Sequence, residues 1–194
     1  MIGIILATDM ARHMTDINNF KSLIQEKKIE NGVNAASLID KSTPAKEFDT
    51  KQQLLEMIVH AADISTQTRP FDCAREWTYL LFDEFFHQGD VEKSKDLPVS
   101  FLCDRTTTQI PEAQPGFLNF ILVPTFQVLS QAIPYCQEQY EGAKANIDNW
   151  KNHVETEEEK KTYTRTKSIT DKPAKSPRQS FDIDFMDEVN ELDQ

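Results

Sequence analysis

The chain has 194 residues with 21 basic and 32 acidic side chains, which gives a formal charge of −11. This charge disfavours non-specific nucleic-acid binding, because phosphate backbones would be repelled. No apolar run reaches the ~20 residues that a membrane-spanning helix needs, and Cys73, Cys103 and Cys136 are too widely spaced for a disulfide framework or a zinc motif. We therefore expect a cytoplasmic protein with reduced cysteines, no membrane span and no nucleic-acid partner.

Apolar residues recur at helical spacing along most of the first 152 residues, without an alternating strand pattern of useful length. Residues 1–14 have the character of the last turns of an apolar helix, because no capping residue precedes Ile2. We expect further helices over 15–28, 50–63 and 71–87, the last ended by Gln88-Gly89-Asp90. A loop with Pro98 and Pro111 follows. A long helical stretch then runs from Gly116 to Asn152 and bends at Pro124 and Pro134. The pattern predicts an all-α fold.

A change in composition near residue 154 divides the chain. Residues 1–152 are expected to form one folded part, and residues 153–194 a charged, disordered tail. The tail has an acidic block, a basic stretch over 160–178 rich in Ser, Pro and Lys, and an acidic end. Such a composition buries too little apolar surface to fold alone, so a solvated linker is favoured over a docking element or phosphorylation at Ser176.

A few side chains could carry chemistry, although each has a plain alternative. His60 and Asp63 share a helix face and could both bind a metal, or could form an ordinary polar helix end. Asp9 follows an apolar run, where an ionised group needs a partner or a wet cleft. Gln114 could bind the edge of a purine while the ring of Phe117 stacks on its face, or the two could be a loop glutamine and a core aromatic residue.

Five stretches in one order carry a family resemblance: ILATDMARHM (5–14), HAADIS (60–65), EFFHQGDVE (84–92), CDR (103–105) and QPGFLNFILVP (114–124). Over roughly residues 3–150 this series resembles the C-terminal half of the catalytic domain of class I cyclic-nucleotide phosphodiesterases. The resemblance implies a compact, multi-helix, HD-type all-α domain that hydrolyses cyclic AMP or cyclic GMP to the 5′-monophosphate. It also implies two divalent metals, Zn²⁺ with Mg²⁺ or Mn²⁺, that activate the attacking hydroxide, and a possible homodimer.

On the metal side of that site, the resemblance makes Asp63 a metal ligand. It places Asp9 in the pocket near the metal-bound waters, and it gives His60 no direct role. Thr66 stands where many members have an asparagine that contacts the nucleotide, and Gln67 replaces the proline that follows it. The resemblance therefore implies a metal at Asp63 and leaves the contact from Thr66 in doubt.

On the base side of that site, Gln114 resembles the glutamine that binds the purine, and Phe117 resembles the ring that stacks on it. Thr78 and Leu81 fall where the opposite wall of the nucleotide slot is expected. Neighbouring residues of the same helix are expected to be structural or to belong to the core: Trp77, Leu80, Phe82 and Glu84.

The family's upstream HNxxH and HD stretches, which supply the general-acid histidine and most metal ligands, have no counterpart here. The chain has four histidines, and none is followed by aspartate. We therefore expect no catalytic residue in this chain, a domain truncated on its N-terminal side with the apolar faces of 1–14 and 50–63 left open, and no activity of the chain alone. The alternative is a catalytically dead cyclic-nucleotide-binding or regulatory protein. Since an amide can rotate, Gln114 does not distinguish adenine from guanine.

Overall fold

The computed structural model describes residues 2–26 and 35–164, and every regular element in these two ranges is helical. The α-helices are α1 (Ile2–Leu6), α2 (His13–Glu26), α3 (Pro44–Asp63), α4 (Phe71–Ser94), α5 (Ile110–Phe117), α6 (Val123–Ala132), α7 (Gln137–Asn152) and α8 (Glu157–Thr164). The shorter elements are the 3-10 turns η1 (Met10–Arg12), η2 (Ala35–Leu38), η3 (Ser65–Thr68) and η5 (Pro134–Cys136), and the π-helical segment η4 (Leu118–Leu122). The expected all-α fold is confirmed, and none of the described helices is both long and apolar enough to cross a membrane.

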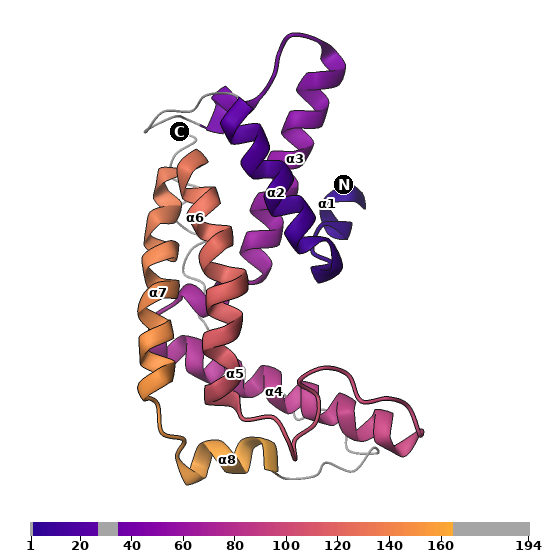
Figure 1. Cartoon of the computed structure of the whole chain (residues 1–194), viewed down its shortest axis with the longest axis vertical. Coiled ribbons are helices and arrows are strands. Elements are labelled where there is room, and N and C mark those ends of the chain that lie inside the picture. Colours follow the sequence, from indigo (N-terminus) through magenta and orange to yellow (C-terminus); the bar gives the residue numbers. More distant parts are fainter. Residues whose placement is uncertain (1, 27–34, 165–194) are drawn as a thin grey trace, which may run out of the picture.

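The structure contains two pairs of helices, α2 with α3 and α6 with α7 (Figure 1). The helices α6 and α7 pack side by side, and the pair α2 and α3 packs against α6. From the end of α3 the chain passes through η3 into α4, which extends away from both pairs, with α8 packed against it. The segment η3 thus lies where α4, α7 and η4 meet.

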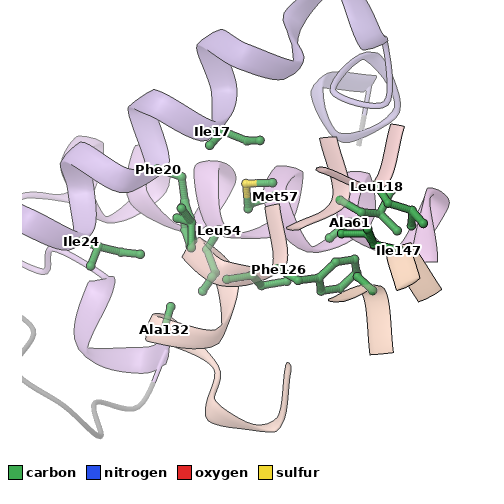
Figure 2. Close-up of a cluster of buried hydrophobic side chains, with 14 of the residues drawn as sticks. Ile17, Phe20, Ile24, Leu54, Met57, Ala61, Leu118, Phe126, Ala132 and Ile147 are labelled. Atoms are coloured by element: carbon green, nitrogen blue, oxygen red, sulfur yellow. The ribbon is translucent and has the colours of Figure 1, made fainter. Parts of the chain in front are cut away.

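The core lies where α2 and α3 face α6 and α7 (Figure 2). Phe20 and Ile24 of α2 meet Leu54 and Met57 of α3, and Phe126 of α6 packs against this group. Burial of a side chain of this size stabilises the fold by roughly 1.5–3 kcal/mol relative to exposure. Not every apolar face is covered, however. Large apolar side chains stay exposed on α1 and on the outer face of α3, as expected for these two segments: Ile2, Ile5, Leu6, Leu55 and Val59.

The first two helical segments differ from the sequence expectation at their ends. Residues 1–14 do not form one helix, because Asp9 ends the apolar run and caps a separate turn by accepting a hydrogen bond from the Ala11 amide at 2.9 Å. The next helix, expected over 15–28, begins earlier at His13 and is described as far as Glu26, and residues 27–34 lie outside the described ranges. The helix expected over 50–63 begins at Pro44, since Thr43 caps it by accepting from the Lys46 amide.

The expected end of α4 at Gly89 is wrong, because the helix continues to Ser94. Gly89 is buried within the helix, where a Cβ atom would overlap the carbonyl oxygen of Cys103 and lie 2.7 Å from its carbonyl carbon. Glycine is required here for close packing of the following loop on α4, and it does not terminate the helix. The loop is then held by Glu92, whose carboxylate accepts hydrogen bonds from the backbone amide and hydroxyl of Ser100, each at 2.7 Å.

The helix predicted to begin near Gly116 begins instead at Ile110, with Pro111 in its first turn, where its missing N–H costs no hydrogen bond. The chain then passes from α5 through η4 to α6, and the π-helical turn η4 ends just before Pro124. Proline cannot donate to the carbonyl four residues earlier, so a local change of helix type at this point has an identifiable cause. The expected bend at Pro134 is present as the turn η5, and the end at Asn152 agrees with the structure.

Residues 153–164 were expected to belong to a disordered tail, but the structure shows that they continue the fold. Thr156 and Glu159 form a capping box at the start of α8, in which each side chain accepts from the other residue's amide, at 3.2 and 2.7 Å. Tyr163 of α8 stacks on Tyr79 of α4 with ring centroids 6.1 Å apart. Residues 165–194, which include Ser176, lie outside the described residues.

One carboxylate joins α8 to α4. Glu155 accepts hydrogen bonds from the phenol groups of both Tyr79 and Tyr163, at 3.0 to 3.1 Å. Arg75 of α4 pairs with Glu159 of α8 at 3.2 Å. Burial is the main cause that raises the pKa of each of the two phenols, and the negative charge and hydrogen bonds of Glu155 add to it. While α8 is attached, each of the two phenols therefore keeps its proton to a higher pH than a free tyrosine does.

Candidate functional site

The two carboxylates expected near the phosphate lie at the ends of neighbouring elements. Asp63 is the last residue of α3 and is exposed. Asp9 is also exposed, and one of its oxygens is occupied by the cap of η1. Thr66 follows in η3 and is half-buried. These side chains could contact a ligand that approaches from solvent. No hydrogen bond joins Asp9 to Asp63 in the described ranges.

Metal binding needs more ligands than this arrangement offers. Among residues 2–26 and 35–164, no group of three or more His, Cys, Asp and Glu side chains is placed to hold a metal ion. A zinc site in a protein generally has three or four protein ligands. The described residues therefore do not fit a complete metal centre, and Asp63 on its own could supply only part of one.

His60, three residues before Asp63, is buried and contacts a second histidine. Its ring is 2% exposed, and its Nε2 atom lies 2.8 Å from Nδ1 of His13, which is equally buried. The contact joins α2 to α3. The spacing of His60 and Asp63 left a metal role open for His60, whereas the family resemblance gives it no direct role, and this stays a prediction. The partner, His13, was not singled out from the sequence, because a contact between residues 47 positions apart leaves no local signal.

The residues expected to bind a purine both lie on α5. Gln114 is 5% exposed, and its Oε1 atom is buried and accepts no hydrogen bond from any described residue. Phe117 ends α5 one turn later, half-buried against the core. Leaving a buried amide oxygen without a donor costs about 1–3 kcal/mol. Gln114 therefore carries a buried acceptor without a donor in the described ranges, one helical turn before Phe117.

The turn η3 is held in place by buried polar contacts. The Thr78 hydroxyl donates to Oε1 of Gln67 at 3.1 Å or to the Ala74 carbonyl at 2.8 Å, and the Gln67 amide donates to the Ala74 carbonyl at 3.3 Å. From α7, the side-chain amide of Asn146 donates to the carbonyls of Gln67 and Arg69, at 2.9 and 2.8 Å. Thr78 itself is fully buried, so it supports Gln67 rather than presenting its hydroxyl to solvent.

Close approach of α7 to η3 depends on a second residue that the sequence did not single out. A Cβ atom at Gly142 would overlap the carbonyl oxygen of Thr68 and lie 3.3 Å from its carbonyl carbon. Gly142 lies one turn before Asn146 on α7. One signal for Asn146 exists in the sequence, since it shares a helix face with the buried residues Ala143, Ile147 and Trp150. An asparagine on such a face requires internal hydrogen-bond partners.

The outer face of α4 differs from what the sequence predicted. Leu81 is 43% exposed, so it is free to contact a ligand. Leu80, expected in the core, is 52% exposed, and that expectation is wrong, whereas Phe82 is buried as predicted. Trp77 and Glu84, interpreted as structural, are exposed as well. The buried face of α4 carries Thr78, Tyr79 and Phe82. The exposed residues Trp77, Leu80, Leu81 and Glu84 recur at helical spacing and so share the opposite face.

Comparisons with known proteins agree on one family. The family model described as 3′5′-cyclic nucleotide phosphodiesterase matches residues 1–143. Isoform F of the 3′,5′-cyclic-AMP phosphodiesterase of Drosophila melanogaster is 31% identical over 155 residues, which are 79% of this chain and 22% of that protein. A dual specificity calcium/calmodulin-dependent 3′,5′-cyclic nucleotide phosphodiesterase 1B of Bos taurus is 38% identical over 130 residues, 67% of this chain and 21% of that protein.

Solved structures give the same result for the fold. LmjPDEB1 in complex with IBMX matches 77% of this chain with a TM-score of 0.62 and 27% identity, and the match covers 41% of that chain. The phosphodiesterase domain of the Salpingoeca rosetta rhodopsin phosphodiesterase gives a TM-score of 0.63 and 28% identity, with 42% of that chain covered. The chain thus spans about a fifth of the curated relatives and less than half of these solved phosphodiesterase chains.

Proposed function

Because the chain belongs to the 3′5′-cyclic nucleotide phosphodiesterase family, we propose that it forms the base-binding side of a site that hydrolyses 3′,5′-cyclic nucleotides to 5′-monophosphates. The substrate would be cyclic AMP, cyclic GMP or both. A cytoplasmic location and a homodimer through the catalytic domain remain parts of the same proposal.

The buried acceptor on Gln114 is the observation that carries this proposal. A purine presents N–H donors and ring-nitrogen acceptors along one edge, and an amide side chain can pair with both kinds of atom. The ring of Phe117, one turn further along α5, would stack on the base, which is worth roughly 1–3 kcal/mol by alanine substitution. Leu81 would contact the opposite face of the base, while Thr78 acts indirectly by holding Gln67 and the turn that carries Thr66.

The role proposed for Asp63 and Asp9 is on the phosphate side. Divalent metals, Zn²⁺ with Mg²⁺ or Mn²⁺, would supply Lewis-acid stabilisation of the phosphate charge in a complete domain. Asp63 would be one ligand, and Asp9 would hydrogen-bond water near it. The described residues do not complete such a centre, so we propose that hydrolysis requires the remaining portion of a phosphodiesterase domain, which this chain does not match.

A second candidate is a protein that binds cyclic nucleotides without hydrolysing them. The lack of three clustered metal ligands within the described ranges favours this reading for the chain by itself. The two candidates share Gln114 and Phe117 and differ in whether further metal ligands join Asp63 in the working protein.

Two measurements test the proposal and separate the candidates. We expect the purified chain to bind cyclic AMP or cyclic GMP in a calorimetric titration. Gln114→Ala should weaken binding about tenfold or more, because the buried amide that would hydrogen-bond the base is lost. The matched control is Gln127→Ala, at an exposed glutamine of α6. Absence of binding, or equal binding by Gln114→Ala, would refute the base-binding role. Hydrolysis with added Mg²⁺ and Zn²⁺ by a longer chain from the same locus, together with its loss in Asp63→Ala, would favour the hydrolase over the inactive binder.

A further inference from the structure

A pocket lies between α2 and α3, and none of the residues proposed to contact the nucleotide lines it. Its volume is about 240 Å³. Buried side chains of Phe20, Met57 and His60 contribute to the lining, and the charged side chains of Arg12, Asp16 and Glu56 lie beside them. The pocket therefore combines buried side chains with charged ones.

The histidine pair at this pocket has hydrogen-bonding capacity that the protein does not use. His13 Nδ1 and His60 Nε2 are 2.8 Å apart, so one ring donates to the other. The outer atoms, His13 Nε2 and His60 Nδ1, are buried and form no hydrogen bond with the residues that the structure describes. Burial, followed by repulsion from His60, lowers the pKa of His13, which favours the neutral form of that ring. When His60 donates to His13, its Nδ1 atom is an acceptor.

Asp16 adds a second unused acceptor to the pocket. Its Oδ1 atom pairs with Arg12 at 3.2 Å, while Oδ2 is buried without a hydrogen-bond donor in the described part of the chain. Glu56 brings a further carboxylate, which accepts from the neutral amide of Gln52 at 2.8 Å. Two carboxylates thus face one guanidinium in this pocket, which leaves an excess negative charge. Buried acceptors with excess negative charge favour a cationic ligand that carries N–H donors.

We propose that this pocket binds a primary ammonium or guanidinium group, held by Asp16 Oδ2 and His60 Nδ1. The attached alkyl group would lie on Phe20 and Met57. The same chemistry could come from a free small amine or from a lysine or arginine side chain of another polypeptide. Binding would fix the histidine pair in the arrangement in which His60 donates to His13, because the ligand's N–H donors need an acceptor at Nδ1.

NMR of the ¹⁵N-histidine-labelled full chain tests this directly, since the sequence has only four histidines. The probes are n-butylammonium and guanidinium, and the matched control is tetramethylammonium, which has the same charge but no N–H donor. We expect butylammonium to shift the His60 and His13 nitrogens saturably, and tetramethylammonium to leave them unchanged. Equal shifts with tetramethylammonium, or no saturable shift with either N–H probe, would overturn the proposal.

A conservative variant assigns the effect to the pocket. Asp16→Asn keeps the size of the side chain but removes the charge, and we expect the Kd for butylammonium to rise about tenfold or more. The control, Asp49→Asn, changes an exposed aspartate of α3 that does not line this pocket. An unchanged Kd in Asp16→Asn, with normal helicity by circular dichroism, would overturn the assignment. Tighter binding of butylammonium than of N-acetyl-lysinamide would identify a free amine as the source, and the reverse order a polypeptide side chain.

Discussion

The close contact between α7 and η3 gives the sharpest test of how the candidate site is supported. In Gly142→Ala, the added Cβ would overlap the Thr68 carbonyl oxygen and approach its carbonyl carbon to 3.3 Å. Both atoms belong to the backbone, so no side chain can rotate away to make room. The variant must therefore move α7 away from the turn that carries Thr66.

The magnitude follows from three terms. Alanine in place of glycine favours a helix interior by about 1 kcal/mol. Overpacking against rigid atoms costs typically about 1–3 kcal/mol. Movement of α7 also breaks the two hydrogen bonds from Asn146 to the carbonyls of Gln67 and Arg69, each worth about 1 kcal/mol. We expect a net destabilisation of about 2–4 kcal/mol, and a melting temperature about 5–15 °C lower for a chain of this size.

Urea unfolding followed by tryptophan fluorescence measures this change, because Trp150 is buried on the same helix. The matched control is Gly116→Ala, since a Cβ there meets no atom within 4 Å. The control should be as stable as the parent chain or more stable by up to about 1 kcal/mol. If Gly142→Ala equals the control in stability, the close approach of α7 to η3 is not required by the fold, and the reasoning fails.

Two further predictions concern the attachment of α8. Thr156→Ala removes the cap of this helix and should lower the free energy of unfolding by about 1 kcal/mol. Release of α8 would be detected as faster amide exchange over 157–164, and unchanged exchange would contradict the capping box. In an absorbance titration at alkaline pH, we expect two of the four tyrosines, Tyr79 and Tyr163, to ionise well above the ordinary value of 10. Because their folded pKa values are raised, the stability that they contribute is complete below pH 10 and is lost as pH rises further; four tyrosines titrating together would refute this network.

Much of the helical pattern could be predicted from the sequence, because apolar periodicity is a local property. The faces of α2 and α3 that carry Phe20 and Leu54 are buried as their spacing indicates. The ends of helices were less well predicted where two signals competed. Gly89 has the character of a helix terminator, but the contact that requires a glycine there comes from Cys103, across the loop that follows. No local pattern distinguishes a glycine that ends a helix from one that another segment packs against.

In the candidate site, too, relations between residues close in the sequence could be predicted, and contacts between distant residues could not. Gln114 and Phe117 could be paired from the sequence, because they lie one turn apart on one helix. The residues that hold η3 could not, since Asn146 binds a turn that lies 77 and 79 positions earlier in the chain. The His13–His60 contact spans 47 positions and is equally invisible to periodicity. The sequence therefore identifies the side chains that could meet a ligand more readily than those that hold them in place.

At Thr66-Gln67 this chain departs from the family pattern, and the structure shows how the turn is held there. The family resemblance places a proline at position 67, where a fixed φ angle would stiffen the turn without further contacts. Gln67 has no such restriction, but it is buried, and its amide and carbonyl groups bond to Thr78, to the Ala74 carbonyl and to Asn146. Hydrogen bonds with groups on α4 and α7 thus hold this turn where a proline would restrict the backbone. Changes in α4 or α7 can therefore loosen the turn that carries Thr66, and Gly142→Ala tests this from the side of α7.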